Sequence, residues 1–177
     1  EHDYIAQHYD AKPTREDVSL QSRRILDSFI ADEDVDDILS HPFMRLSFLA
    51  NKCKGPLRSE NKILQAGGLS LASGAKRIHR RMAGLFFKSA LFHANGGRPP
   101  FARMNEFPLD VHSLANSNLK DALMASASIP YVMRGVDNIQ GIPGMFRDGG
   151  VLDYHLDLPF LPKGDDGIVF YPHFYDY

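Results

Sequence analysis

The residues with the clearest chemical potential are Asp148, Gly149 and Gly150, an acid followed directly by two glycines. A carboxylate accepts a proton readily at neutral pH only when partial burial raises its pKa. The glycines suit such a position, because they can adopt positive φ and bring the backbone close to a cleft. Arg147 should point to the opposite face of a strand and so leave the carboxylate of Asp148 unpaired. Because Asp-Gly is also a common turn dipeptide, an ordinary turn is the alternative interpretation.

A second group of polar residues follows this triplet. Asp153, His155 and Asp157 alternate along the chain and would share one face of a strand. Such a set could hold a metal ion, but a solvated or hydrogen-bonded strand edge is the commoner explanation. We therefore expect neither a metal nor a cofactor. His173 could be read as a triad histidine, although it follows Asp148 closely in the sequence.

The charged residues indicate one local basic patch, but the net charge of the chain indicates no highly charged partner. The chain has 20 Lys and Arg against 22 Asp and Glu, a formal charge of −2, which disfavours nucleic acid as a partner. Residues 76–81 (KRIHRR) are basic and could bind phosphate head groups or an anionic membrane, although a solvated helix face is the commoner explanation. Phe86, Phe87, Leu91 and Phe92 could touch acyl chains, but at helical spacing such residues are more often core.

Hydrophobic spacing predicts the elements that must position these residues. Helices are predicted over about 15–30, 32–40, 61–93 and 114–126, with the third broken or kinked by Gly67-Gly68 and Gly74. Strands are predicted within 43–53, 103–109 and 167–171. Helices interleaved with isolated strands favour an α/β layered fold with helices on both faces of a sheet. Because these strands are few for such a sheet, we expect further strands before Glu1.

Length and composition indicate one soluble globular domain, or a large piece of one. The chain has 177 residues, of which 44% are hydrophobic and 24% charged. Cys53 is its single cysteine, which excludes an internal disulfide framework and a cysteine-based zinc cluster. The first residue is not Met, and we expect the chain to begin within a longer protein. A cytoplasmic or membrane-peripheral location is favoured, while the oligomeric state stays open.

Two segments carry a resemblance to a known family. Residues 121–130 (DALMASASIP) resemble the helix-to-loop element of patatin-like phospholipases, in which a helix rich in Ala and Ser ends in Ile-Pro. Residues 146–153 (FRDGGVLD) look like the aspartate motif of the same family, a strand that runs into Asp-Gly-Gly. Residues 154–160 and 167–174 resemble a bacterial patatin-like subgroup in which this order recurs. The similarity covers roughly 120–174, and residues 14–110 are consistent with it but carry no diagnostic motif.

The resemblance implies both a fold and a reaction. The fold would be a three-layer α/β/α sandwich, with residues 1–177 as the C-terminal portion of a single acyl hydrolase domain. The reaction would be hydrolysis of acyl esters in phospholipids or related lipids by a Ser–Asp dyad, with transient contact at a membrane surface. Asp148 would be the catalytic base, and Gly149 and Gly150 would line the substrate site.

The sequence departs from the family pattern at the nucleophile. The family has a Gly-x-Ser-x-Gly elbow and an upstream glycine-rich loop that supplies oxyanion donors. The nearest string, residues 68–72 (GLSLA), lacks the final glycine and follows a predicted helix, so Ser70 is a poor candidate. Ser126 and Ser128 follow a helix and at most line the cleft. We therefore expect the elbow serine before Glu1 and an inactive isolated chain, with a non-catalytic lipid- or protein-binding domain on the same scaffold as the alternative.

Overall fold

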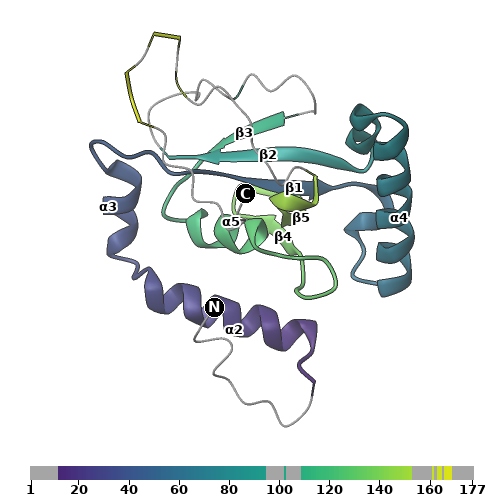
Figure 1. Ribbon diagram of the computed structural model, residues 1–177. Coiled ribbons are helices and arrows are strands. Elements are labelled where there is room, and N and C mark those ends of the chain that lie inside the picture. The colour runs from purple at the N-terminus through teal and green to yellow at the C-terminus, as the bar shows by residue number, and fades with distance from the viewer. Residues whose placement is uncertain are drawn as a thin grey trace, which may run out of the picture.

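The structure is a computed structural model that describes residues 12–94, 102, 109–152, 161, 163–164 and 166–168. In these ranges the chain has a mixed α/β fold with four helices and a five-stranded open sheet, ordered β3-β2-β1-β5-β4 (Figure 1). The helices are α2 (Arg15–Phe29), α3 (Asp34–Ser40), α4 (Lys62–Ile78) and α5 (Leu119–Ser126). The strands are β1 (Ser47–Cys53), β2 (Phe87–His93), β3 (Leu109–Ser113), β4 (Val136–Ile139) and β5 (Ile142–Asp148). No helix of the described part is both long and apolar enough to cross a bilayer.

Strand β1 is the centre of the sheet. It pairs antiparallel with β2 along its whole length and with β5 from Lys52 to Ala50, while β2 and β3 run parallel. Strands β4 and β5 form an antiparallel hairpin whose turn includes Gly141 at φ +79°. Asn138, in β4, also has positive φ, a conformation that asparagine tolerates better than most residues. The strand that ends in Asp148 therefore lies between two neighbours and is not at an edge.

The two faces of the sheet carry separate cores, as strand alternation requires. One core joins β1, β2 and β5 to α5 and α3, and includes Ala50, Ala90, Phe92, Phe146, Leu119, Ala122, Ala125, Val35 and Leu39. The other joins the opposite face of β1 and β2 to α4 and to two 3-10 helices, η1 (Gly55–Arg58) and η2 (Arg80–Leu85). Its members are Cys53, Leu57, Ala72, Ala83, Phe87 and Leu152. The mixed α/β class expected from the sequence is confirmed. Helix α4 packs against η1 and η2 at one end of the sheet, so helices on both faces and the three-layer patatin-like arrangement stay a proposal.

Local signals place several elements correctly. Thr14 caps α2, with its hydroxyl accepting from the Asp17 amide and the Asp17 carboxylate accepting from the Thr14 amide. Helix α2 then ends one residue before the predicted limit. Strand β1 starts at Ser47, within the predicted range, and is followed by Gly55 at φ +54°.

The prediction of helix over residues 61–93 is wrong in its last part. Helix α4 ends at Ile78, a 3-10 helix follows, and Phe87–His93 is strand β2. A short apolar run fits a buried strand as well as a helix, and pairing with β1 decides in favour of the strand. The glycines do not break α4, because Gly67 and Gly74 face open space and Gly68 lies against the side chain of Leu57.

Other boundaries also differ from the prediction. Helix α5 begins at Leu119 and not near Leu114, because the side chain of Asn118 accepts from the Ala115 amide and holds the preceding residues in a turn. Periodicity alone did not predict the β4–β5 hairpin. The predicted strand over 103–109 lies outside the described residues except at its last position, Leu109, which starts β3. In the predicted strand over 167–171, residues 167–168 have no regular structure and the rest lie outside the described residues.

Candidate functional site

Asp148 is the last residue of β5. The short 3-10 helix η4 (Gly149–Val151) follows it directly. The carboxylate of Asp148 is half-buried, and its Oδ1 accepts a hydrogen bond of 2.9 Å from the Gly150 amide. Burial raises the pKa of the Asp148 carboxyl, and the Gly150 hydrogen bond opposes this in part. Asp148 therefore caps a turn, in agreement with the alternative interpretation of Asp-Gly as a turn dipeptide. The pKa of its carboxyl is also shifted in the direction that favours a general base.

The two segments that carry the family resemblance meet at this point. The Asp148 amide donates a hydrogen bond of 3.1 Å to the carbonyl oxygen of Ser128. The Ser126 hydroxyl donates over 2.7 Å to the carbonyl oxygen of Leu49 in β1. The chain after α5 is therefore fixed beside the end of β5, next to the aspartate.

Ser126 and Ser128 have structural roles in this arrangement. The Ser128 hydroxyl is fully buried and donates over 2.6 Å to the Met124 carbonyl, closing the end of α5. The sequence allows Ser128 at most a cleft-lining position, and with 0% exposure its side chain lines no open surface. Neither hydroxyl has a recorded contact with the carboxylate of Asp148.

Gly149 is required by close packing, and neither glycine of the pair has positive φ. Gly149 and Gly150 both lie in a 3-10 helix, where φ is negative. A Cβ on Gly149 would lie 2.5 Å from the carbonyl oxygen of Leu49, so the backbone there passes directly against β1. The expectation of positive φ is thus corrected, and the close approach at Gly149 is to the neighbouring strand β1, so the predicted approach to a cleft stays a prediction.

A buried asparagine holds the same segment from the other strand. The side-chain amide of Asn51 donates to the carbonyl oxygens of Asp148, over 2.8 Å, and Gly149, over 2.9 Å. Asn51 is buried, at a strand position that faces the core containing Cys53. The sequence analysis did not select this residue. The available signal was an amide side chain beside Ala50 and close to Cys53, because a buried amide must find hydrogen-bond partners.

Arg147 lies on the opposite face from Asp148, as predicted. Its guanidinium is 1% exposed and donates over 2.7 Å to Oε1 of Glu60, which also accepts from the Gly135 amide. Arg15 of α2 reaches the other oxygen of Glu60 over 3.3 Å. The strand therefore directs its cation into a separate ion pair, and no cation of the described residues contacts the carboxylate of Asp148.

Several other candidates are not brought to this site. Ser70 is exposed in the middle of α4, where no strand-to-helix elbow exists. Asp153, His155, Asp157 and His173 lie outside the described residues. Within the described ranges no group of three or more His, Cys, Asp or Glu side chains could hold a metal ion.

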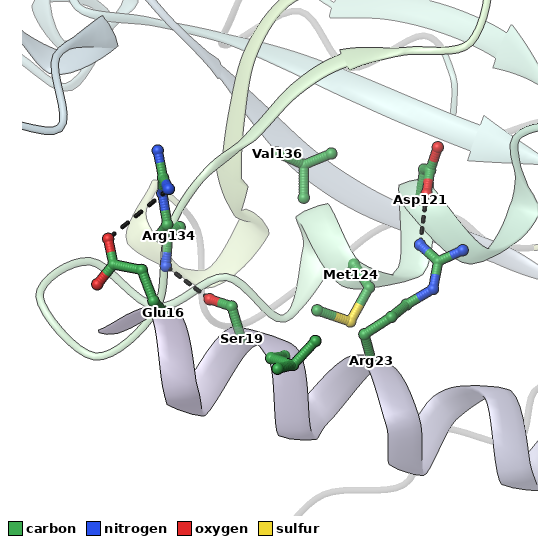
Figure 2. A pocket seen from close by; sticks show the side chains of 8 residues that line it. Glu16, Ser19, Arg23, Asp121, Met124, Arg134 and Val136 are labelled. Carbon is green, nitrogen blue, oxygen red and sulfur yellow. Dashed lines mark hydrogen bonds and ion pairs between the residues drawn. The ribbon is translucent and has the colours of Figure 1, made fainter. Parts of the chain in front are cut away.

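A pocket of about 340 Å³ lies between α2 and α5, away from Asp148 (Figure 2). Its charged groups are paired with one another. Arg23 contacts Asp121 over 2.5 Å, and Arg134 contacts Glu16 over 3.7 Å. The remaining lining residues are Ser19, Leu20, Met124 and Val136. This surface joins a helix to its neighbours and has no free reactive group among the residues that line it.

Comparison with known proteins does not assign this arrangement to a family. The chain matches no protein-family model, no curated protein and no solved structure. The case for function therefore depends on the Asp148 site itself and on the resemblance in residues 120–174.

Proposed function

We propose that the protein is a lipid acyl hydrolase of the phospholipase A or esterase type, in which Asp148 is the base of a Ser–Asp dyad. The observation that carries the proposal is the position of Asp148, a half-buried carboxylate with a raised pKa at the end of an interior strand. The contact between the Asp148 amide and the Ser128 carbonyl supports it, because it joins the two segments that resemble patatin-like proteins.

Asp148 would act twice in this reaction. It first accepts the proton of the serine hydroxyl while the serine oxygen attacks the ester carbonyl, and it then gives that proton to the departing alcohol. In the second half it accepts a proton from water, whose oxygen attacks the acyl carbon. The carboxylic acid leaves and the serine oxygen regains the proton from Asp148. No histidine is needed if burial keeps the pKa of the carboxyl high enough for this exchange.

The serine is expected before Glu1, in an elbow that follows a strand. The oxyanion donors would come from a glycine-rich loop in the same region. The hydroxyls of Ser126 and Ser128 both donate to backbone carbonyls, and Ser70 lies within a helix, so none of these three is proposed as the nucleophile. No metal or cofactor takes part in this scheme.

The test is Asp148→Asn in the full-length protein, assayed on a phospholipid and on a short-chain acyl ester. We expect hydrolysis to fall by at least about a thousandfold, since the variant cannot accept the proton. Asp137→Asn is the matched control, because Asp137 is exposed on the adjacent strand β4. A fluorophosphonate probe should label one serine of the wild-type protein. Unchanged turnover in Asp148→Asn would exclude the dyad.

The alternative is a non-catalytic lipid-binding domain on the same scaffold. It is favoured by one specific feature, the exposed apolar and basic surface of α4. The two functions differ in the fluorophosphonate experiment. A protein that binds lipid but contains no labelled serine would be a binding domain.

A further inference from the structure

Helix α4 has two apolar stripes, and only one of them faces the protein. Gln65, Gly68 and Ala72 form the buried side, against η1 and η2. On the other side Ile63, Gly67, Leu71, Gly74 and Ile78 recur at intervals of three and four residues, which places them on one helical face. A helix that only covered a core would carry charged residues on that outer face.

The outer stripe is open to solvent in the described structure. Ile63, Leu71 and Ile78 are 82%, 61% and 78% exposed, and Leu85 of η2 is 67% exposed. A Cβ added at Gly67 or Gly74 would meet nothing within 4 Å. Large side chains at this exposure, gathered on one helix and the turn after it, are typical of a binding surface.

The charges around this stripe all have one sign. Residues 62–85 contain five Lys and Arg and no Asp or Glu, although the whole chain has a formal charge of −2. Arg77 and Arg81 are exposed, and neither side chain has a partner among the described residues. Lys76 donates to the Leu152 carbonyl, which holds the end of α4 to the rest of the fold.

The acidic part of the molecule lies at the other end. Helix α3 begins with Asp34, Asp36 and Asp37, and Figure 1 shows α3 and α4 at opposite ends of the sheet. This separation gives the protein a positive end and a negative end. Such an asymmetry orients a protein at a negatively charged surface, with α4 toward it and α3 away.

We infer that the outer face of α4, together with η2, docks on an anionic phospholipid bilayer. An apolar stripe flanked by Lys and Arg is the pattern of a helix that lies in the membrane interface. A second copy of the chain is a poorer occupant, because a two-fold contact would bring Arg77 and Arg81 against the same cations. An acidic protein partner would match the charges but has no observation that favours it over lipid.

This inference rests on the proposed function. A lipid acyl hydrolase takes its substrate from a membrane surface, and docking of α4 would bring the protein to that surface. Its test does not depend on turnover. Full-length protein is floated with vesicles of phosphatidylcholine alone, and with vesicles in which one third of the lipid is phosphatidylserine. We expect binding to the anionic vesicles only, weakening as salt is added.

Two variants test the two parts of the surface. Ile78→Asp should weaken vesicle binding by about tenfold or more, since it places a charge where an apolar side chain would enter the bilayer. The double variant Arg77→Glu with Arg81→Glu should weaken it by roughly twentyfold or more. The matched controls are Phe29→Asp and Arg24→Glu, on exposed positions of α2, and they should bind as the wild type does.

The results of these experiments either support or overturn membrane docking by α4. Absence of wild-type binding to the anionic vesicles would overturn it, as would equal binding by folded Ile78→Asp protein. A change of oligomeric mass in Ile78→Asp without vesicle binding by the wild type would assign the face to a second copy. Asp148→Asn should bind as the wild type does, so that loss of hydrolysis and loss of docking are separate results.

Discussion

The backbone amide of Asp148 donates a hydrogen bond of 3.1 Å to the carbonyl oxygen of Ser128. These residues are twenty positions apart, and the bond fixes the end of β5 to the chain that leaves α5. Asn51 of β1 holds the carbonyl of Asp148 from the other side. The backbone of Asp148 is thus tied on both sides, while the Gly150 amide is the only donor to its carboxylate among the residues that the structure describes.

Asp148→Asn should make the folded protein more stable at neutral pH. Burial raises the pKa of the Asp148 carboxyl above its unfolded value of about 4, so the folded state prefers the protonated form. Stability from this preference is complete below the unfolded pKa and is lost as pH rises through the folded pKa. Asparagine stays neutral and keeps an oxygen for the Gly150 amide. We expect the melting temperatures of variant and wild type to differ at pH 7 and to converge below about pH 4. A lower melting temperature for the variant at pH 7 would contradict this.

Gly149→Ala should destabilise the protein by roughly 1–3 kcal/mol, the usual cost of overpacking. The new Cβ would lie 2.5 Å from the Leu49 carbonyl oxygen, and that atom belongs to the backbone of the central strand and cannot turn away. The free energy of unfolding in urea measures the effect. Gly67→Ala is the control, since Gly67 is helical with open space around it and should gain up to about 1 kcal/mol. Equal stabilities for the two variants would show that the strand can shift.

Glu60→Gln should cost about 3 kcal/mol, because it leaves the buried guanidinium of Arg147 without its counter-ion. Glu60 also accepts from the Gly135 amide, so the loop before β4 should loosen as well. Urea unfolding measures the loss, and hydrogen exchange at Gly135 reports the loop. Glu16→Gln removes the partner of the exposed Arg134 and should cost less than about 1 kcal/mol. A similar loss of unfolding free energy in both variants would mean that burial does not increase the contribution of the Glu60–Arg147 ion pair.

Cys53 should be unreactive in the folded protein. Its thiol is buried, and burial raises its pKa to about 12, so almost no thiolate is present at neutral pH. We expect no reaction with Ellman's reagent under native conditions and one thiol per chain in urea. Because reaction requires opening of the core around Cys53, the native labelling rate should increase in Glu60→Gln. Fast labelling of the native wild type would place the thiol at the surface.

The sequence by itself determined features that depend on near neighbours. Hydrophobic spacing predicted the start of α2 near residue 15, and the Thr14–Asp17 capping pair that fixes this start lies within one turn of the chain. Alternation placed β1, and it also predicted that Arg147 and Asp148 would face opposite sides of the sheet. The Asp-Gly-Gly triplet and the Ile-Pro segment were singled out by type and spacing. The interleaved helical and strand patterns were sufficient for the mixed α/β class.

Only the tertiary structure decided the features that depend on distant partners. Phe87–His93 is a strand because it pairs with β1, some forty residues earlier in the chain, although its apolar run also fits a helix. The Glu60 carboxylate meets Arg147 across 87 positions, and no local pattern encodes that contact. Ser128 is buried at the end of α5, where its hydroxyl donates to the Met124 carbonyl. Gly149 is required because β1 passes directly behind it. Local periodicity predicts which face of a helix or strand a side chain lies on. Which distant residue it contacts there depends on how the whole chain packs.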